Sequence, residues 1–282
     1  MADSEDSGEI RRILVLVDAS RTSQAALEAA AELAARHDAE LATLYVEDTD
    51  LLRLAGLPFA REVGTTSGVS RPLNLEQLER RLKGQAAEVR QRLRALAARH
   101  GVRWSLQVAR GRAEAVALAR AIPGDLLVVG KTGWSRLPYK RLGSTPRHLI
   151  RKADVDVSVM VYSPPASPRH HPIVAVFDDP DSGPRALALA AYIARTEADT
   201  LTILIPEEEA ERLVPEVRRW LAGRGVDATL KLLRGREPEA LTNVLHRERL
   251  QALVIHRSSP LIAGAVRQRL LEALDVPVVL VP

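Results

Sequence analysis

The stretch RILVLVD at residues 12–18 is an aliphatic run that ends on Asp18. Ser20 and an alanine-rich, leucine-containing segment follow it at residues 21–36. A continuous apolar run, rather than an alternating one, is typical of a strand covered on both faces, as in a parallel sheet. Strands that alternate with helices form such a sheet. The stretch therefore predicts an α/β fold.

The same pattern returns in the second half of the chain. The stretch PIVAVFD at residues 172–178 is again an apolar run that ends on an aspartate and precedes a helix-forming segment. The run LLVV at residues 126–129 has its counterpart in ALVI at residues 252–255, and apolar runs at 155–161 and 276–281 close the two halves. Self-similarity of this kind indicates a tandem duplication.

A proline-rich segment separates the two copies. The sequence SPPASPRHH at residues 163–171 suits an extended connector. We therefore predict two domains, residues 10–162 and residues 172–282. Each is expected to be a doubly wound parallel sheet of the Rossmann-like, adenine nucleotide α-hydrolase-like kind.

The elements of the first copy can be located along the chain. We expect strands near residues 11–17, 40–46, 103–109, 125–129 and 156–161, and helices near residues 21–36, 75–100, 112–121 and 145–152. Residues 48–74 form a segment too long for a plain connection. This segment is either a lid, a partner surface or a disordered insertion.

Composition excludes several classes of protein. The chain has no cysteine, which removes disulfides, thiol catalysis and cysteine-ligated zinc. Residues 1–9 are polar and acidic, unlike a signal peptide, and no apolar stretch approaches the ~18 residues of a spanning helix. We expect a cytoplasmic protein without a membrane partner.

Neither the charge, the aromatic content nor the placement of histidines indicates a nucleic-acid or metal site. The net charge of +4 is small, and arginines alternate with glutamates along the helices, as on solvated faces. Aromatic residues make up only 3% of the chain, so stacking platforms for nucleic acid are scarce. The pair His170 and His171 has no third ligand nearby in sequence, and no metal site is expected.

A glycine-rich pattern follows the strand that ends at Val129. Gly130 and Gly133 precede a nine-residue loop, and Gly143 and Ser144 then open a helix. Glycines let backbone amides approach a ligand, and the N–H groups and dipole at a helix start favour an anion. Pro146 suits the first turn, and Ser144 can cap the helix and donate its hydroxyl. The pattern predicts a phosphate-binding nest.

Four cations lie in or next to the loop of this nest. Lys131, Arg136, Lys140 and Arg141 are close to the glycines in sequence. They either neutralise phosphate charge or are ordinary exposed loop charges. Trp134, also in the loop, is expected to pack against protein rather than stack on a base.

The spacing Gly-x2-Gly-x9-Gly-Ser resembles the nucleotide-binding signature of the universal stress protein family. Residues 13–20 resemble the opening strand and turn of that family. Residues 44–46 resemble the end of its second strand, and residues 153–161 its last helix-to-strand passage. The resemblance covers nearly all of the first half. It implies the fold predicted above and an adenine nucleotide as ligand.

The resemblance also implies which residues bind the nucleotide. They are Leu16, Val17, Asp18, Val46, Val129, Gly130, Gly133, Gly143, Ser144 and Thr145. In the family, the counterparts of Leu16 and Val17 line the base pocket, that of Asp18 lies beside adenine and ribose, and that of Val46 contacts adenine. Those of Val129 and Gly130 flank the ribose, and the last four hold phosphates. Asp18 could instead simply cap the helix that starts near Arg21.

The second half lacks several of these features. Gly130 corresponds to His256, Gly133 to Ser259 and Ser144 to Ala265, and the loop is shorter by five residues. Added side chains and a shortened loop should crowd the pocket, so we predict little or no nucleotide binding there. Asp178 and Asp179 are then helix-capping residues, and His256, without a partnered nucleophile, is a structural residue.

We therefore expect a tandem universal stress protein that binds ATP, or related ADP or AMP, in its first domain and acts as a stress-response sensor or regulatory module. Magnesium can accompany ATP. No catalytic residue is assigned, since no general base is paired with a nucleophile and no Walker-type phosphate loop occurs. The alternatives are a slow ATP-hydrolysing or α-phosphate-cleaving enzyme of this fold, or a nucleotide-free interaction module.

The resemblance also bears on assembly. It implies that the two domains pair through their last strands within one chain, as a pseudo-dimer. Two chains could associate further into a homodimer, and an unknown protein partner is expected.

Overall fold

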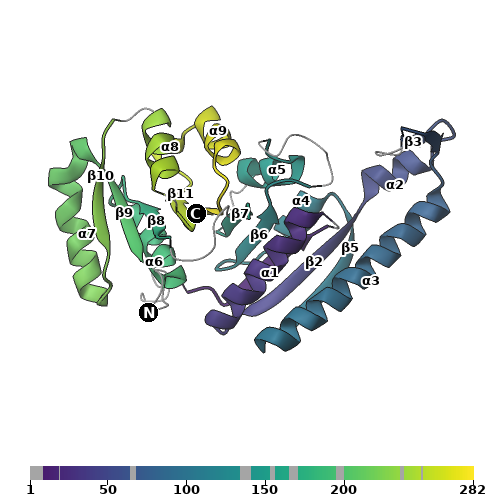
Figure 1. Ribbon diagram of the computed structural model, residues 1–282, viewed down its shortest axis with the longest axis horizontal. Coiled ribbons are helices and arrows are strands. Elements are labelled where there is room, and N and C mark those ends of the chain that lie inside the picture. Colours follow the sequence, from purple (N-terminus) through teal and green to yellow (C-terminus); the bar gives the residue numbers. More distant parts are fainter. Residues whose placement is uncertain are drawn as a thin grey trace.

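A ten-stranded sheet with helices on both faces forms the core of the protein (Figure 1). The computed structural model describes residues 9–18, 20–63, 68–133, 141–152, 156–164, 171–194, 200–235, 238–248 and 250–282. The predicted α/β class is confirmed, because strands and helices alternate and nearly every strand pairing is parallel.

The first half, residues 10–162, contains the predicted elements with ends within about two residues of those expected. They are β1 (Arg12–Val17), α1 (Arg21–Arg36), β2 (Glu40–Asp48), α3 (Leu75–His100), β5 (Trp104–Gly111), α4 (Ala113–Arg120), β6 (Leu126–Gly130), α5 (Ser144–Lys152) and β7 (Ser158–Tyr162).

The long segment after β2 is folded where the structure describes it. It forms α2 (Thr49–Ala55) and a small hairpin of β3 (Arg61–Val63) and β4 (Ser70–Pro72). Ala55 of α2 packs on Leu78 and Leu82 of α3 in a separate apolar cluster. Figure 1 shows α2 and the hairpin at the end of the molecule farthest from the second half. The segment is therefore an addition anchored on α3, and residues 64–67 lie outside the described part.

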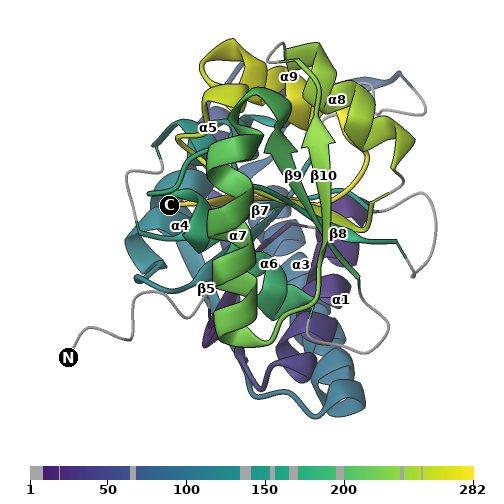
Figure 2. The same cartoon turned by 90° about the vertical axis from the view of Figure 1, so that its left-hand side faces the viewer.

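The second half, residues 172–282, repeats the order with shorter connections. Its elements are β8 (Ile173–Val176), α6 (Gly183–Ile193), β9 (Leu201–Pro206), the 3-10 turn η1 (Glu207–Glu209), α7 (Ala210–Arg224), β10 (Thr229–Leu233), α8 (Pro238–Arg247), β11 (Ala252–His256), the 3-10 turn η2 (Pro260–Ile262), α9 (Ala265–Ala273) and β12 (Val278–Val281). In Figure 2, α8 and α9 lie next to one another and α7 runs beside the outer strands β9 and β10.

The strand order reverses once in each half. Across the sheet it reads β10-β9-β8-β11-β12-β7-β6-β1-β2-β5. In the first half the chain moves outward from β1 through β2 to β5, then returns to β6 on the other side of β1. The crevice between β1 and β6 is thus the topological switch point, where ligands bind in sheets of this kind. The equivalent crevice of the second half lies between β8 and β11.

The two halves join through their last strands. β7 and β12 pair antiparallel, with Met160 opposite Val279, whereas the pairings within each half are parallel. The predicted pairing of the two last strands within one chain is confirmed.

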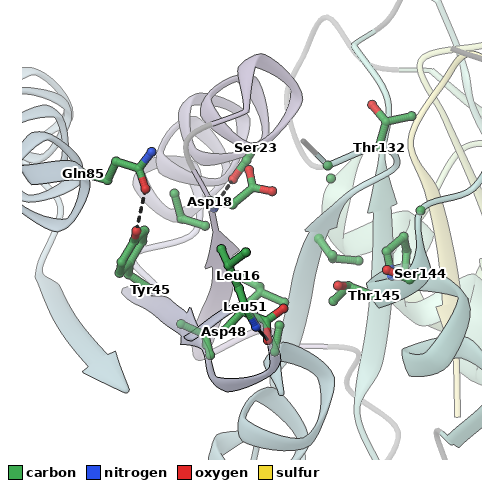
Figure 3. Close-up of a pocket in the computed structure, with 18 of the residues that line it drawn as sticks. Leu16, Asp18, Ser23, Tyr45, Asp48, Leu51, Gln85, Thr132, Ser144 and Thr145 are labelled. Atoms are coloured by element: carbon green, nitrogen blue, oxygen red, sulfur yellow. Dashed lines mark hydrogen bonds between the residues drawn. The ribbon is translucent and has the colours of Figure 1, made fainter. Parts of the chain in front are cut away.

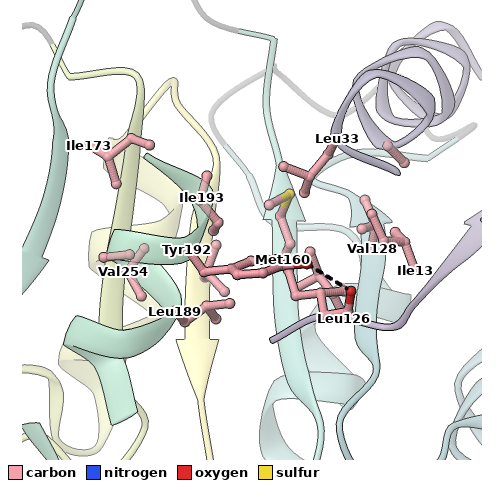
Figure 4. Close-up of a cluster of buried hydrophobic side chains, with 14 of the residues drawn as sticks. Ile13, Leu33, Leu126, Val128, Met160, Ile173, Leu189, Tyr192, Ile193 and Val254 are labelled. Atoms are coloured by element: carbon pink, nitrogen blue, oxygen red, sulfur yellow. Dashed lines mark hydrogen bonds between the residues drawn. The ribbon is translucent and has the colours of Figure 1, made fainter. Parts of the chain in front are cut away.

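Apolar side chains continue across this join on both faces of the sheet. On one face, α1, α3, α6 and α7 cover a single cluster, and on the other α4, α5, α8 and α9 cover a second. In Figure 4, Tyr192 of α6 lies against Met160 of β7. The Tyr192 hydroxyl donates to the Ile10 carbonyl at 3.1 Å, and its ring stacks on His37 with centroids 4.1 Å apart. The halves therefore share their cores.

Candidate functional site

A cavity of about 440 Å³ opens at the switch point of the first half, beyond the carboxyl ends of β1 and β6 (Figure 3). The ten residues predicted to bind a nucleotide all line it. They come from the end of β1, the end of β2, the end of β6 and the start of α5. Parallel strands bring these segments together because their carboxyl ends meet at one edge of the sheet.

Asp18 lines the cavity and lies between Tyr45 of β2 on one side and Ser144 of α5 on the other (Figure 3). Its backbone N–H donates to Ser23 Oγ at 2.8 Å, and its Oδ1 accepts from Ser20 N at 2.9 Å. Ser20, not Asp18, caps α1, because the Ser20 side chain accepts from Ser23 N. The alternative of Asp18 as the helix cap is therefore wrong. These bonds fix the carboxylate, and its Oδ2 faces Gly133.

Two glycines of the signature are required by close packing. A Cβ on Gly133 would lie 3.2 Å from Asp18 Oδ2. A Cβ on Gly130 would lie 3.3 Å from Thr22 Cγ2 and 3.4 Å from Ser23 N, at the first turn of α1. Larger residues at these positions would push the start of α1 and the Asp18 carboxylate aside. The two glycines thus allow Asp18 and the first turn of α1 to lie close to the segment that follows β6.

The start of α5 differs in detail from the predicted nest. The Gly143 N–H donates to the Lys131 carbonyl at 2.9 Å, so this amide is not free for an anion. The Gly143 carbonyl accepts from Arg147 N at 3.2 Å, and the helix begins at Ser144. Gly143 is therefore the residue before the helix, and Ser144 is not the cap. In the first turn, the N–H groups of Ser144 and Thr145 have no intrahelical acceptor.

Lys131 does not point at the cavity, which overturns its role as a phosphate-neutralising cation. The side chain is 3% exposed, and Nζ donates to the carbonyls of Glu272 at 3.0 Å and Leu274 at 2.6 Å, both in the second half. Burial lowers the pKa of this lysine, against the opposing effect of Asp275. The sequence could not reveal this, because the partners lie more than 140 residues away.

The structure describes one of the other three cations of the loop. Arg141 is exposed. Arg136, Lys140 and Trp134 lie outside the described residues.

The wall opposite α5 was not predicted from the sequence. It is formed by residues from β2, α2 and α3, namely Tyr45, Leu51, Leu78, Arg81, Leu82 and Gln85. The Tyr45 hydroxyl donates to Gln85 Oε1 at 3.0 Å, a bond visible in Figure 3. Burial, together with the charges of Glu47 and Asp18, raises the pKa of Tyr45 to about 12. The helical spacing of Leu78, Leu82 and Gln85 indicates a shared face but not that this face lines a cavity.

The equivalent crevice of the second half is bridged by side chains. Ser259 Oγ donates to Asp178 Oδ2 across the gap between β8 and β11. Burial raises the pKa of Asp178, only partly offset by this bond. The prediction of Asp178 and Asp179 as helix caps is wrong, because Ser182 is the cap residue of α6. The Asp178 carboxylate accepts from Ser259 and the Asp179 carboxylate accepts from the Ser182 hydroxyl. In the first half, Gly133 is the counterpart of Ser259 and has no side chain that could form such a bond with Asp18.

His256, which replaces Gly130 in the second half, has structural partners. Its Nε2 donates to the Pro282 carbonyl at 2.6 Å, and its Nδ1 accepts from Ser258 Oγ at 2.6 Å. Burial lowers the pKa of His256, which agrees with a neutral ring holding one donor and one acceptor bond. The predicted structural role of His256 is consistent with this geometry.

Two further searches of the described residues have definite results. No helix in the described part is long and apolar enough to cross a membrane. Within the same residues, no three His, Cys, Asp or Glu side chains come together as a metal site.

The sequence belongs to the Universal stress protein family, whose profile matches residues 9–161. Three solved structures share the fold over almost the whole chain. A universal stress protein from Archaeoglobus fulgidus is 16% identical, with 98% of this chain and 97% of that one covered and a TM-score of 0.67. A protein of unknown function from Pseudomonas aeruginosa is 17% identical, with 99% of this chain and 94% of that one covered and a TM-score of 0.64. A universal stress protein from the same species is 18% identical, with 98% of this chain and 94% of that one covered and a TM-score of 0.60. No curated protein matches the sequence.

Proposed function

We propose that the first half binds ATP, or a related adenine nucleotide, and that the protein acts as a regulatory binding module in a stress response. The observation that carries the proposal is the cavity at the switch point, which gathers all ten signature residues. Leu16, Val46 and Val129 supply an apolar wall for a base, and Asp18 supplies an acceptor for a ribose hydroxyl or an adenine amine. The free N–H groups at the start of α5 receive the phosphates.

The division into a nucleotide-binding domain at residues 10–162, a linker at 163–171 and a degenerate domain at 172–282 belongs to the same proposal. The bridge between Asp178 and Ser259 supports one nucleotide per chain. A magnesium ion brought by ATP would take phosphate oxygens and water as most of its ligands. Two carboxylates of this chain line the cavity, Asp18 and Asp48. Asp48 caps α2 by accepting from Asp50 N and Leu51 N, so Asp18 is the carboxylate that we propose for such an ion or its water shell.

Variants of Gly143 test the proposal directly. A Cβ at this position meets Lys131 O at 3.4 Å and Pro146 Cδ at 3.5 Å, which are ordinary contacts, so the fold accepts a side chain here. Gly143→Ala should retain nucleotide binding, whereas Gly143→Asp places a carboxylate beside the phosphates and should abolish it. His256→Ala, in the second half, should bind as the wild type does.

Two measurements decide the outcome. Mass spectrometry of the purified protein detects a nucleotide that co-purifies, and thermal unfolding with excess ATP detects binding. Ligand at a hundredfold excess over Kd adds about 2.7 kcal/mol of stability. The absence of both a co-purifying nucleotide and a thermal shift would refute the proposal. Loss of binding in His256→Ala would show that the site lies in the second half and not in the first.

The enzymatic alternative shares the site and is tested by its products. Incubation with ATP and magnesium would yield AMP and pyrophosphate if the bond between the α- and β-phosphates is cleaved, and ADP and phosphate if the γ-phosphate is removed. We propose a binding module, so turnover should stay far below the usual enzymatic range of about 1–1000 s⁻¹.

A further inference from the structure

The two described ends of the loop before α5, residues 131–133 and 141–143, are bonded to the second half of the chain. Lys131 immediately follows β6, and its side chain crosses to the C-terminal end of α9. The last carbonyls of a helix have no intrahelical donor, and the helix dipole favours a cation there. Nζ satisfies two of these carbonyls, Glu272 O and Leu274 O, and lies 3.4 Å from Asp275 Oδ1.

A second contact reaches the other end of the same loop. Glu272 Oε1 accepts from the backbone N–H of Leu142 at 3.4 Å and lies 3.8 Å from the Arg147 guanidinium. Gln268, one turn earlier on α9, donates to the same oxygen at 2.9 Å and so fixes its position. Both the residue that leaves β6 and the residue that enters the nest are therefore bonded to one helix end.

The two contacts meet at Gly143. Its N–H donates to the backbone carbonyl of Lys131 at 2.9 Å, and its neighbour Leu142 donates to Glu272. The position of Gly143 thus depends on Lys131 through one bond, and Lys131 is fixed by α9. Ser144 and Thr145, which line the cavity, follow Gly143 directly.

From this geometry we propose that Lys131 and Glu272 are positioning residues through which α9 of the second half holds the phosphate nest of the first half, so that affinity for the phosphates depends on the second half. The effect on affinity rests on the proposed function, whereas the holding of the loop does not. The degenerate half then serves the intact site although it binds no nucleotide itself.

The affinities for ATP and adenosine, compared by calorimetry, separate this role from general stability. Adenosine contacts the base and ribose parts of the cavity but not the nest. Lys131→Met, which keeps the length and apolar stem of the side chain, should weaken ATP binding about tenfold or more, while adenosine binding stays within about twofold. Glu272→Ala should likewise lower the affinity for ATP relative to the affinity for adenosine, which we call the ATP-to-adenosine ratio.

Lys231→Met is the matched control. Lys231 lies on β10, at the far end of the sheet, and pairs with Glu248. Its substitution removes a lysine ion pair without touching the nest. The control should leave the ATP-to-adenosine ratio unchanged. A ratio that is the same in Lys131→Met and the wild type would overturn the proposal.

Amide hydrogen exchange of the nucleotide-free protein provides a readout that does not need a ligand. The N–H group of Gly143 should exchange about tenfold faster in Lys131→Met than in the wild type, because α9 no longer fixes the residue 131 carbonyl that accepts from it. The N–H group of Leu142 should exchange about tenfold faster in Glu272→Ala, which removes its acceptor. If the wild type binds neither ATP nor adenosine, the proposed function fails, and faster exchange still supports the holding of the loop. Unchanged exchange at both amides would overturn it.

Discussion

Removal of the Asp125 carboxylate should destabilise the protein without affecting its site. Asp125 precedes β6 and its side chain is 2% exposed. Its Oδ1 accepts from Arg12 Nε at 2.9 Å, and its Oδ2 accepts from Ile122 N at 2.8 Å and from a second nitrogen of Arg12. The pair joins the N-terminal ends of β1 and β6, the two strands that flank the cavity at their other ends.

The expected size of the effect follows from this burial. Breaking a buried ion pair by removing one partner costs about 3–5 kcal/mol, because the remaining charge stays buried. Arg12 keeps 23% of its side-chain exposure, so water compensates part of the loss, and we expect Asp125→Ala to cost about 3 kcal/mol. At about 2 °C per kcal/mol for a chain of this size, the melting temperature should fall by about 6 °C.

Thermal and urea unfolding measure this change, and ATP titration of the folded variant provides the control for function. Asp125→Asn should lose less than Asp125→Ala, since its amide oxygen can still accept from Ile122 N. ATP affinity should match the wild type, because the pair lies at the opposite ends of the strands from the cavity. Asp125→Ala melting within about 1 °C of the wild type would refute the reasoning from burial.

Four further predictions concern the two crevices. Calorimetric titration should give one adenine nucleotide per chain, and two would show that the second half binds as well. The pKa of Asp178 is raised, so the stability it contributes below its ordinary pKa is lost as pH rises through the folded value. Asp178→Asn should therefore be more stable than the wild type at pH 7 in urea unfolding, and equal or lower stability there would contradict this. Gly130→Ala should cost about 1–3 kcal/mol in the same assay because its Cβ meets Thr22 and Ser23, and wild-type stability would show that the contact relaxes freely. Tyr45→Phe should leave the tyrosinate absorbance at pH 11 almost unchanged, because the pKa of Tyr45 is about 12.

Much of the fold could be predicted because its signals are local. The run at residues 12–18 and its copy at 172–178 are continuous apolar strands, and their shared pattern is sufficient to infer the repeat. The ten signature residues of the cavity were also within reach, because the family resemblance implied them and a parallel sheet brings the carboxyl ends of its strands to one edge. The predicted and observed ends of the helices and strands in the first half agree because the apolar patterns that mark them are also local.

The direction of individual bonds could not be predicted. Lys131 is a cation beside the glycines in sequence, yet its side chain is directed to the end of α9, which offers two carbonyls without intrahelical donors. Gly143 has a free amide only if no carbonyl reaches it, and the Lys131 carbonyl does. The segment at residues 48–74 carries no periodic pattern long enough to show that its α2 packs on α3. Each of these depends on tertiary contacts between distant parts of the chain.

The antiparallel join of β7 with β12 has a consequence for how the two copies can diverge. In an assembly of two identical chains, every substitution appears in both copies at once, so a change that suits one role alters the other. In a fused chain the copies are encoded separately. The second copy can therefore carry His256, Ser259 and Ala265 where the first carries Gly130, Gly133 and Ser144, while β7 and β12 still pair.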